Sequence, residues 1–181
     1  DIPHAPPTPG FSGVQLTEYG LHDSHFGSAS QPPSLLDQLR AVHGPYPTAS
    51  CDHAGGSTRA NLQLLADLHL AAQRKTNVLL DLLGREPWDL FACAFSESHC
   101  AGHWFWAYHD EQHWGYAPRA PEPLRDAVAS IYRALDAAVG QLVAAARADT
   151  VVVLASHGMA PYVAGYQMLP EVLARLGMSS G

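Results

Sequence analysis

The chain has 181 residues, of which 47% are hydrophobic, so it is long enough to form one domain with a real core. Its formal net charge of -7, without a block of like charge, argues against nucleic acid as a partner, because phosphate binding normally uses a clustered basic surface. No apolar run approaches the roughly 18 residues of a membrane-spanning helix, so no membrane association is expected.

The three cysteines and the first residues bear on the origin of the chain. Cys51, Cys93 and Cys100 form no paired framework, and no signal peptide is present, so a reducing, cytoplasmic location is expected. The chain begins at Asp1, without a methionine, in a proline-rich run. The missing methionine and the proline-rich start predict an internal fragment of a longer protein.

The first half of the chain predicts connections and helices. Residues 1–20 are rich in proline and glycine and show no sustained period, which is typical of an extended surface segment. A helix is predicted over residues 32–43, ended by Gly44. A longer helix begins near Ser57 or Thr58, carries one apolar stripe, and has Gly84 where a left-handed cap is expected.

The second half predicts two strands separated by a helix. Residues 89–95 and 151–155 are short apolar runs, typical of strands that are buried on both faces. An irregular aromatic segment reaches Pro123, and apolar residues then recur every three or four positions from Leu124 to Leu142, which predicts a helix. A last helix is expected over residues 170–176. Strand, helix and strand in this order predict an α/β fold with a parallel sheet covered by helices.

Both predicted strands end at side chains that could bind a metal ion. Glu97, His99 and His103 follow the first strand, while Ser156 and His157 follow the second. Ligands gather at the carboxyl ends of parallel strands, and imidazole and carboxylate groups bind zinc or a similar divalent ion. Two histidines four residues apart are by themselves weak evidence in a chain with 11 histidines. The second cluster, with His157 directly after a predicted strand, strengthens the evidence for a metal site. The sequence therefore predicts one metal site shared by the two clusters.

These motifs resemble the type I phosphodiesterase and nucleotide pyrophosphatase branch of the alkaline phosphatase superfamily. The matching stretches are residues 99–103, HCAGH, and residues 155–159, ASHGM. The resemblance covers residues 89–181 well and residues 1–84 loosely. It implies that residues 1–181 form a partial, incomplete domain with an alkaline phosphatase-like fold.

The resemblance also implies roles for individual residues. His99, His103 and His157 would bind a divalent metal, zinc or manganese. His99 and Ser156 replace aspartates that are usual in the family, and serine is a poor substitute for a carboxylate. The second metal would therefore be weakened, altered or absent, unless Glu97 supplies the missing charge. Asp110 and His113 would orient the ligands or contact substrate, with a loop-stabilising hydrogen bond as the alternative.

For an intact member, the resemblance implies hydrolysis of a phosphodiester, pyrophosphate or related phosphoryl ester. An activated hydroxyl would attack in line, and two metal ions would stabilise the attacking and leaving oxygens. The family's nucleophile has no counterpart ahead of residue 20, and its last ligand histidine normally lies beyond Gly181. We therefore expect a small phosphorylated substrate for the whole enzyme and no turnover by this chain alone.

Two other functions compete with this reading. A non-catalytic metal-binding relative, or an inactive fragment, is favoured by Ser156 and by the missing parts of the site. A serine hydrolase that uses Ser156 is the second, because LASHG resembles a nucleophile elbow without its first glycine. The elbow needs a helix directly after the serine, and Pro161 and Gly165 interrupt that segment. The aromatic residues between Trp104 and Tyr116 either wall a substrate pocket or form the core of a loop.

Overall fold

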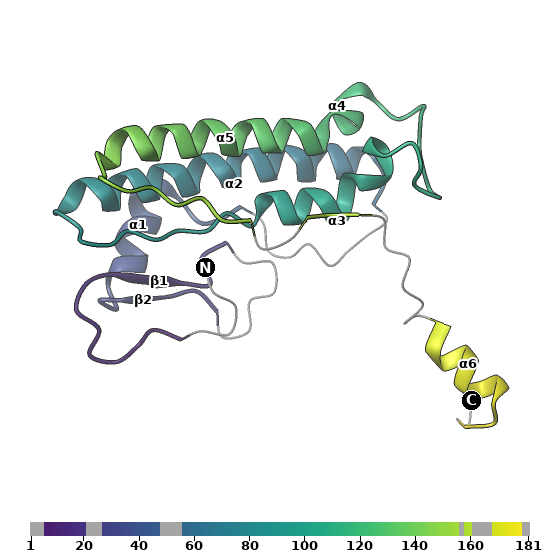
Figure 1. Cartoon of the computed structure of the whole chain (residues 1–181), viewed down its shortest axis with the longest axis horizontal. Helices are drawn as coiled ribbons and strands as arrows, with labels where there is room; N and C mark the ends of the chain where they lie inside the picture. Colours follow the sequence, from purple (N-terminus) through teal and green to yellow (C-terminus); the bar gives the residue numbers. More distant parts are fainter. Residues whose placement is uncertain (1–5, 21–26, 48–55, 156–157, 161–167, 179–181) are drawn as a thin grey trace.

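A computed structural model describes residues 6–20, 27–47, 56–155, 158–160 and 168–178 (Figure 1). These ranges contain two short strands and six helices. The elements are, in chain order, β1 (Gln15–Thr17), β2 (Ala29–Gln31), α1 (Leu35–His43), α2 (Thr58–Arg85), α3 (Glu97–His109), α4 (Glu122–Arg125), α5 (Ala127–Ala146) and α6 (Leu169–Arg175).

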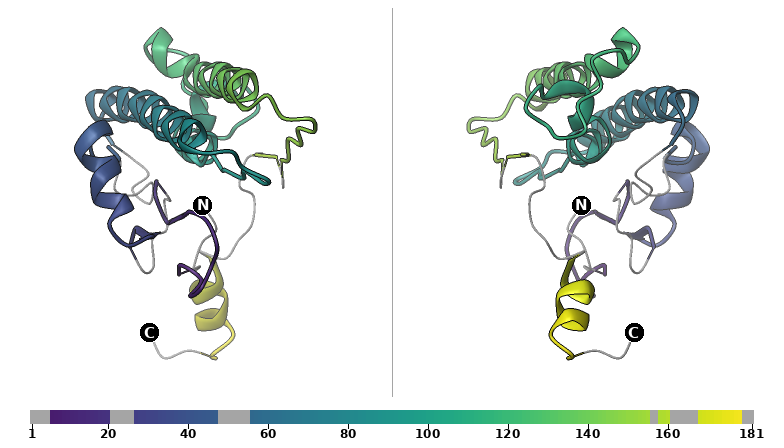
Figure 2. Two further views of the ribbon diagram at one scale, coloured as in Figure 1. Left: turned by 90° about the vertical axis from the view of Figure 1, so that its left-hand side faces the viewer. Right: turned by 90° about the vertical axis from the view of Figure 1, so that its right-hand side faces the viewer.

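The two long helices α2 and α5 lie side by side, and α3 and α4 pack against them (Figures 1 and 2). The Ser57 hydroxyl begins α2 by accepting a hydrogen bond from the Ala60 N–H at 3.2 Å, which satisfies one of the unpaired donors of the first turn. Apolar residues at three-and-four spacing then form a shared core. Its buried members are Leu65, Leu68, Ala72, Cys100, Ala101, Phe105, Leu124, Ala127, Val128, Ile131 and Leu135.

A second core joins the first part of the chain to the other end of α2. Its buried members are Tyr19, Leu35, Leu36, Leu39, Val78 and Leu82. Strands β1 and β2 pair antiparallel beside α1, with Gln15 opposite Gln31. The Asp81 carboxylate accepts hydrogen bonds from His43 of α1 at 2.9 Å and from Arg85 at 3.0 Å. The His43 contact ties α1 to α2, while the Arg85 contact lies within α2.

The parallel sheet that the sequence predicts is not present in the described ranges, where the one sheet is the antiparallel pair β1–β2. Residues 89–95 and 151–155 lie outside any strand. Their apolar side chains include some of the most exposed in the molecule, with Leu90 82% and Leu154 87% accessible. An apolar run becomes a strand only when a neighbouring strand accepts and donates its ladder hydrogen bonds, and neither run is paired in this way with any other described segment.

The helices agree more closely with the sequence, with two corrections. Gly84 lies inside α2, which continues to Arg85, so it is not the cap. Residues 97–109 form α3, where an irregular segment was expected. Consecutive aromatic residues from Trp104 to Trp106 surround α3 with rings and hide the single apolar stripe that normally marks a helix. Among the described residues, no helix combines the length and apolar character that crossing a membrane requires.

Candidate metal centre

Two histidines on α3 point toward each other. His99 and His103 are one helical turn apart and share a face of the helix. Their Nε2 atoms are 2.9 Å apart, and the ring centroids are 4.4 Å apart. The His99 side chain is half-buried, while the His103 side chain is exposed to solvent. The two ring nitrogens thus lie within hydrogen-bond distance of each other near the protein surface, where an ion that replaced this contact could bind both.

The spacing of these nitrogens fits a chelated metal ion. With metal–nitrogen bonds of about 2.05 Å, Nε2 atoms 2.9 Å apart subtend an angle of about 90° at the metal. A tetrahedral zinc site would need them about 3.3 Å apart, so a side-chain movement of roughly 0.4 Å suffices. No cluster of three or more His, Cys, Asp or Glu side chains suited to a metal occurs among the described residues. The pair thus supplies two ligands.

The second motif lies against α3 beside this pair. Gly102 is buried, and a Cβ atom placed on it would come within 2.5 Å of the Met159 Cε atom and 2.9 Å of Cγ. Residues 158–160 accordingly run beside α3 in Figure 1. Glycine at position 102 permits this close approach, and a larger residue would require the Met159 side chain to move. Ser156 and His157 themselves lie outside the described ranges, directly before the segment that contacts Gly102.

The carboxylate of Glu97 faces another part of the molecule. On a helix with about 100° per residue, it lies roughly 200° around from His99. It is fully buried, its Oε1 atom lies 3.2 Å from Lys75 Nζ of α2, and the Tyr46 hydroxyl donates a hydrogen bond to it at 2.8 Å. Glu97 thus forms a buried ion pair and accepts a hydrogen bond on a different side of α3 from the histidine pair.

Asp110 and His113 stabilise the loop that follows α3. The Asp110 carboxylate accepts hydrogen bonds from Trp106 Nε1 at 3.1 Å and from the Gln112 N–H at 2.9 Å. His113 Nδ1 accepts the Gly115 N–H at 3.0 Å. These three hydrogen bonds stabilise the loop, which is the alternative role that the sequence left open.

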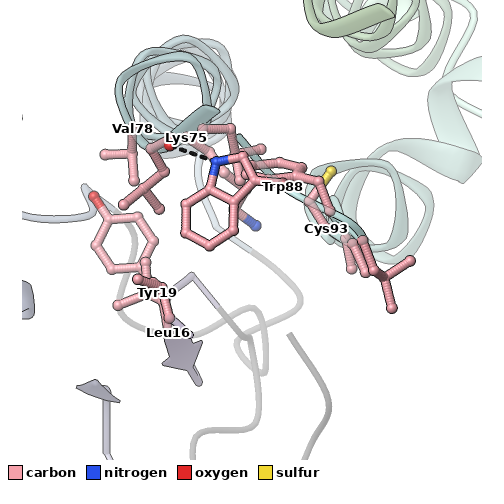
Figure 3. A pocket seen from close by; sticks show the side chains of 13 residues that line it. Leu16, Tyr19, Lys75, Val78, Trp88 and Cys93 are labelled. Atoms are coloured by element: carbon pink, nitrogen blue, oxygen red, sulfur yellow. Dashed lines mark hydrogen bonds between the residues drawn. The ribbon is translucent and has the colours of Figure 1, made fainter. Parts of the chain in front are cut away.

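The aromatic residues of this region do not gather around one cavity. Phe105 is fully buried in the main core, whereas Trp114 is 87% exposed and stacks on His113 with ring centroids 5.3 Å apart. A separate cavity of about 110 Å³ lies between α2, the first strand and residues 88–94 (Figure 3). Tyr19, Val78, Trp88 and Cys93 are among its mainly apolar lining, and no residue of α3 lines it. It is therefore distinct from the histidine pair.

The sequence did not reveal the partners of Glu97. Lys75 is the only lysine of the chain and is 3% exposed. Its ammonium lies 5.3 Å from the ring centroid of Tyr46 and 5.7 Å from that of Phe95, so aromatic faces stabilise the charge as well. The sequence did contain a signal for the burial of Lys75. It lies three residues after Ala72, which belongs to the apolar stripe of α2, and so on the same side of the helix.

The comparisons with known proteins identify the family of the chain. A family model described as type I phosphodiesterase / nucleotide pyrophosphatase matches residues 16–174. It thus extends well into the first half of the chain, where the motifs alone gave only a loose match. Comparisons with curated proteins and with solved structures gave no match. The chain belongs to the type I phosphodiesterase and nucleotide pyrophosphatase family of the alkaline phosphatase superfamily.

Proposed function

We propose that this chain forms part of a metal-dependent hydrolase of phosphodiesters, pyrophosphates or related phosphoryl esters. In this proposal His99, His103 and His157 bind one divalent ion, zinc or manganese. The observation that carries it is the convergence of His99 and His103, with Nε2 atoms 2.9 Å apart, next to the segment that follows His157. Membership of the family supports the reaction class.

Each part of the chain has a defined task in the proposed site. Helix α3 holds two imidazoles on one face, so both nitrogens are positioned before the ion arrives. The contact between Met159 and Gly102 brings the second motif to the same face. A bound divalent ion would stabilise negative charge on a phosphoryl oxygen. Because the chain itself is acidic, an anionic small substrate would depend on that positive charge to bind.

The family relationship also supports a proposal for the two extended segments. We propose that residues 89–95 and 151–155 are strands of the parallel sheet of an alkaline phosphatase-like fold. Each segment directly precedes one half of the metal site. The exposure of Leu90, Val152, Val153 and Leu154 supports this assignment, because such side chains are normally buried in a sheet.

Metal binding by histidine variants tests the proposed function. The purified chain is dialysed against zinc or manganese, and bound metal is measured by elemental analysis for His99→Ala, His103→Ala and His157→Ala. Each substitution removes one ligand and should lower metal affinity at least tenfold. His109→Ala, which removes an exposed histidine from the end of the same helix, is the control and should bind like the unaltered chain.

Three results would overturn all or part of the proposal. Unchanged metal content in all three ligand variants would mean that the histidines are structural. Loss of metal only in His99→Ala and His103→Ala would mean that His157 is not a ligand and that the second motif is not part of the metal site. If all three variants lose metal but no phosphoryl ester is hydrolysed by the whole enzyme loaded with metal, the non-catalytic alternative replaces hydrolysis.

A further inference from the structure

We infer that Glu97 and Lys75 are positioning residues for the metal site: their buried ion pair fixes the orientation of α3 and thereby aims His99 and His103. This inference rests on the proposed function and gives Glu97 a different role from that of a ligand. The Lys75 Nζ and Glu97 Oε1 atoms are 3.2 Å apart, with side chains that are 3% and 0% exposed. The pair joins the middle of α2 to the first residue of α3.

Several contacts concentrate on this end of α3. The Tyr46 hydroxyl donates to the same Glu97 oxygen at 2.8 Å, and the Ser96 hydroxyl donates a short hydrogen bond to the Gly20 carbonyl. Gly20 has φ +79°, and a Cβ atom on it would overlap the Tyr46 ring. Glycine at this position therefore lets the first part of the chain, Tyr46 and α3 meet closely.

The face of α3 roughly opposite Glu97 carries His99 and His103. Beside them, Gly102 contacts the flexible Met159 side chain of the second motif. Even a small rotation of α3 about its axis would move the imidazoles relative to this segment. The directional ion pair opposes such a rotation, because rotating Glu97 would leave two buried charges unpaired.

The apolar core alone specifies this orientation less sharply. Phe105 and Ala101 bury one side of α3, but apolar packing tolerates small rotations more readily than a hydrogen-bonded charge pair. The ion pair thus acts on the metal through the helix, without touching the metal. A carboxylate ligand would instead bind the ion directly, so the two roles give different spectra.

The experiment compares Lys75→Met, Glu97→Gln, the double variant and the milder Tyr46→Phe. The first readout is the nuclear Overhauser contact between the Met159 methyl group and the Gly102 Hα protons. The chain has only three methionines, so methyl labelling gives a simple spectrum. The second readout is the affinity and visible absorption of Co²⁺, and the third is the unfolding midpoint in urea.

Positioning predicts a specific combination of results. Each single variant loses the Met159–Gly102 contact and binds Co²⁺ about tenfold more weakly, while its cobalt spectrum at saturation keeps the same ligand set. The double variant regains stability, because it leaves no buried charge unpaired, but it regains neither the contact nor the affinity. Tyr46→Phe shows the same loss to a smaller degree. The exposed pair Arg175 and Glu171 is the control, and Arg175→Met should change none of these quantities.

Other outcomes overturn the inference. If the double variant recovers contact and affinity together with stability, the pair is merely structural. A cobalt spectrum that changes in Glu97→Gln but not in Lys75→Met would make Glu97 a ligand. If the unaltered chain binds no Co²⁺ at the histidines, the proposed function fails, and the nuclear Overhauser contact alone then decides positioning. If that contact persists in every folded variant, the ion pair does not position α3.

Discussion

The substitution Gly102→Ala tests the junction of the two motifs without removing any polar group. The added Cβ atom would lie 2.5 Å from Met159 Cε and 2.9 Å from Cγ. Carbon atoms pack best at about 3.5–4.0 Å, so Met159 must retreat by roughly 1 Å. Because Met159 is two residues beyond His157, this displacement should move the proposed third ligand.

The expected change in stability is small, since two effects oppose each other. Alanine inside a helix stabilises it by about 0.8–1 kcal/mol relative to glycine. Overpacking at a close contact destabilises by about 1–3 kcal/mol, and the flexible methionine places the effect near the lower limit. We therefore expect a net loss of about 0–2 kcal/mol in the free energy of unfolding. Metal affinity should fall at least tenfold, because one ligand is displaced.

Urea unfolding and Co²⁺ titration measure the two quantities separately. Gly140→Ala is the matched control, because Gly140 is also inside a helix but has open space where the Cβ atom would lie. The Gly140→Ala variant should have a free energy of unfolding about 1 kcal/mol higher than the unaltered chain, with the same affinity for Co²⁺. Adding Met159→Ala to Gly102→Ala removes the overlap and should restore much of the lost affinity. Unchanged affinity in the folded Gly102→Ala variant would refute the idea that this contact holds the second motif at the site.

Two further predictions concern the supporting structure. Hydrogen bonds from Arg85 and His43 lower the pKa of Asp81 from 3.8 to about 2. This pair of contacts therefore stabilises the fold above about pH 4 by roughly 1–2 kcal/mol, and the contribution disappears as the pH falls through 2. In urea unfolding at pH 7, Asp81→Asn should lose this amount, and the difference from the unaltered chain should vanish near pH 2; a constant difference would contradict the assignment. Tyr108→Phe removes the hydroxyl that accepts a hydrogen bond from Asn61 Nδ2 at 2.7 Å, and should lower the free energy of unfolding by about 1–3 kcal/mol because a mostly buried amide is left unsatisfied. An unchanged unfolding midpoint would mean that water replaces the hydroxyl.

The helices with a clear apolar stripe could be predicted from the sequence, because their pattern arises from local spacing. The single stripe predicted from Leu124 to Leu142 corresponds to the consecutive helices α4 and α5, and the helix predicted near Ser57 corresponds to α2. Helix α3 could not be found in this way, because its aromatic rings surround the axis. Glu97, Ala101 and Phe105, spaced by four residues and all buried, mark its inner face.

The strands could not be predicted from local sequence, because a strand depends on a partner elsewhere in the chain. The run from Val151 to Leu154 has the composition of a buried strand, but it is exposed and pairs with no other segment that the structure describes. His99 and His103 were expected on a loop but lie on helix α3. The role of Glu97 was harder to predict, because its partner Lys75 lies 22 residues earlier on another helix.

X-ray absorption spectroscopy of the zinc-loaded chain tests the central claim most directly. If His99, His103 and His157 share one ion, multiple scattering from imidazole rings should fit three histidine ligands with zinc–nitrogen distances of about 2.0–2.1 Å. His157→Ala should then fit two. A spectrum with one imidazole or none, or one that does not change in His157→Ala, would contradict a metal site built from both motifs.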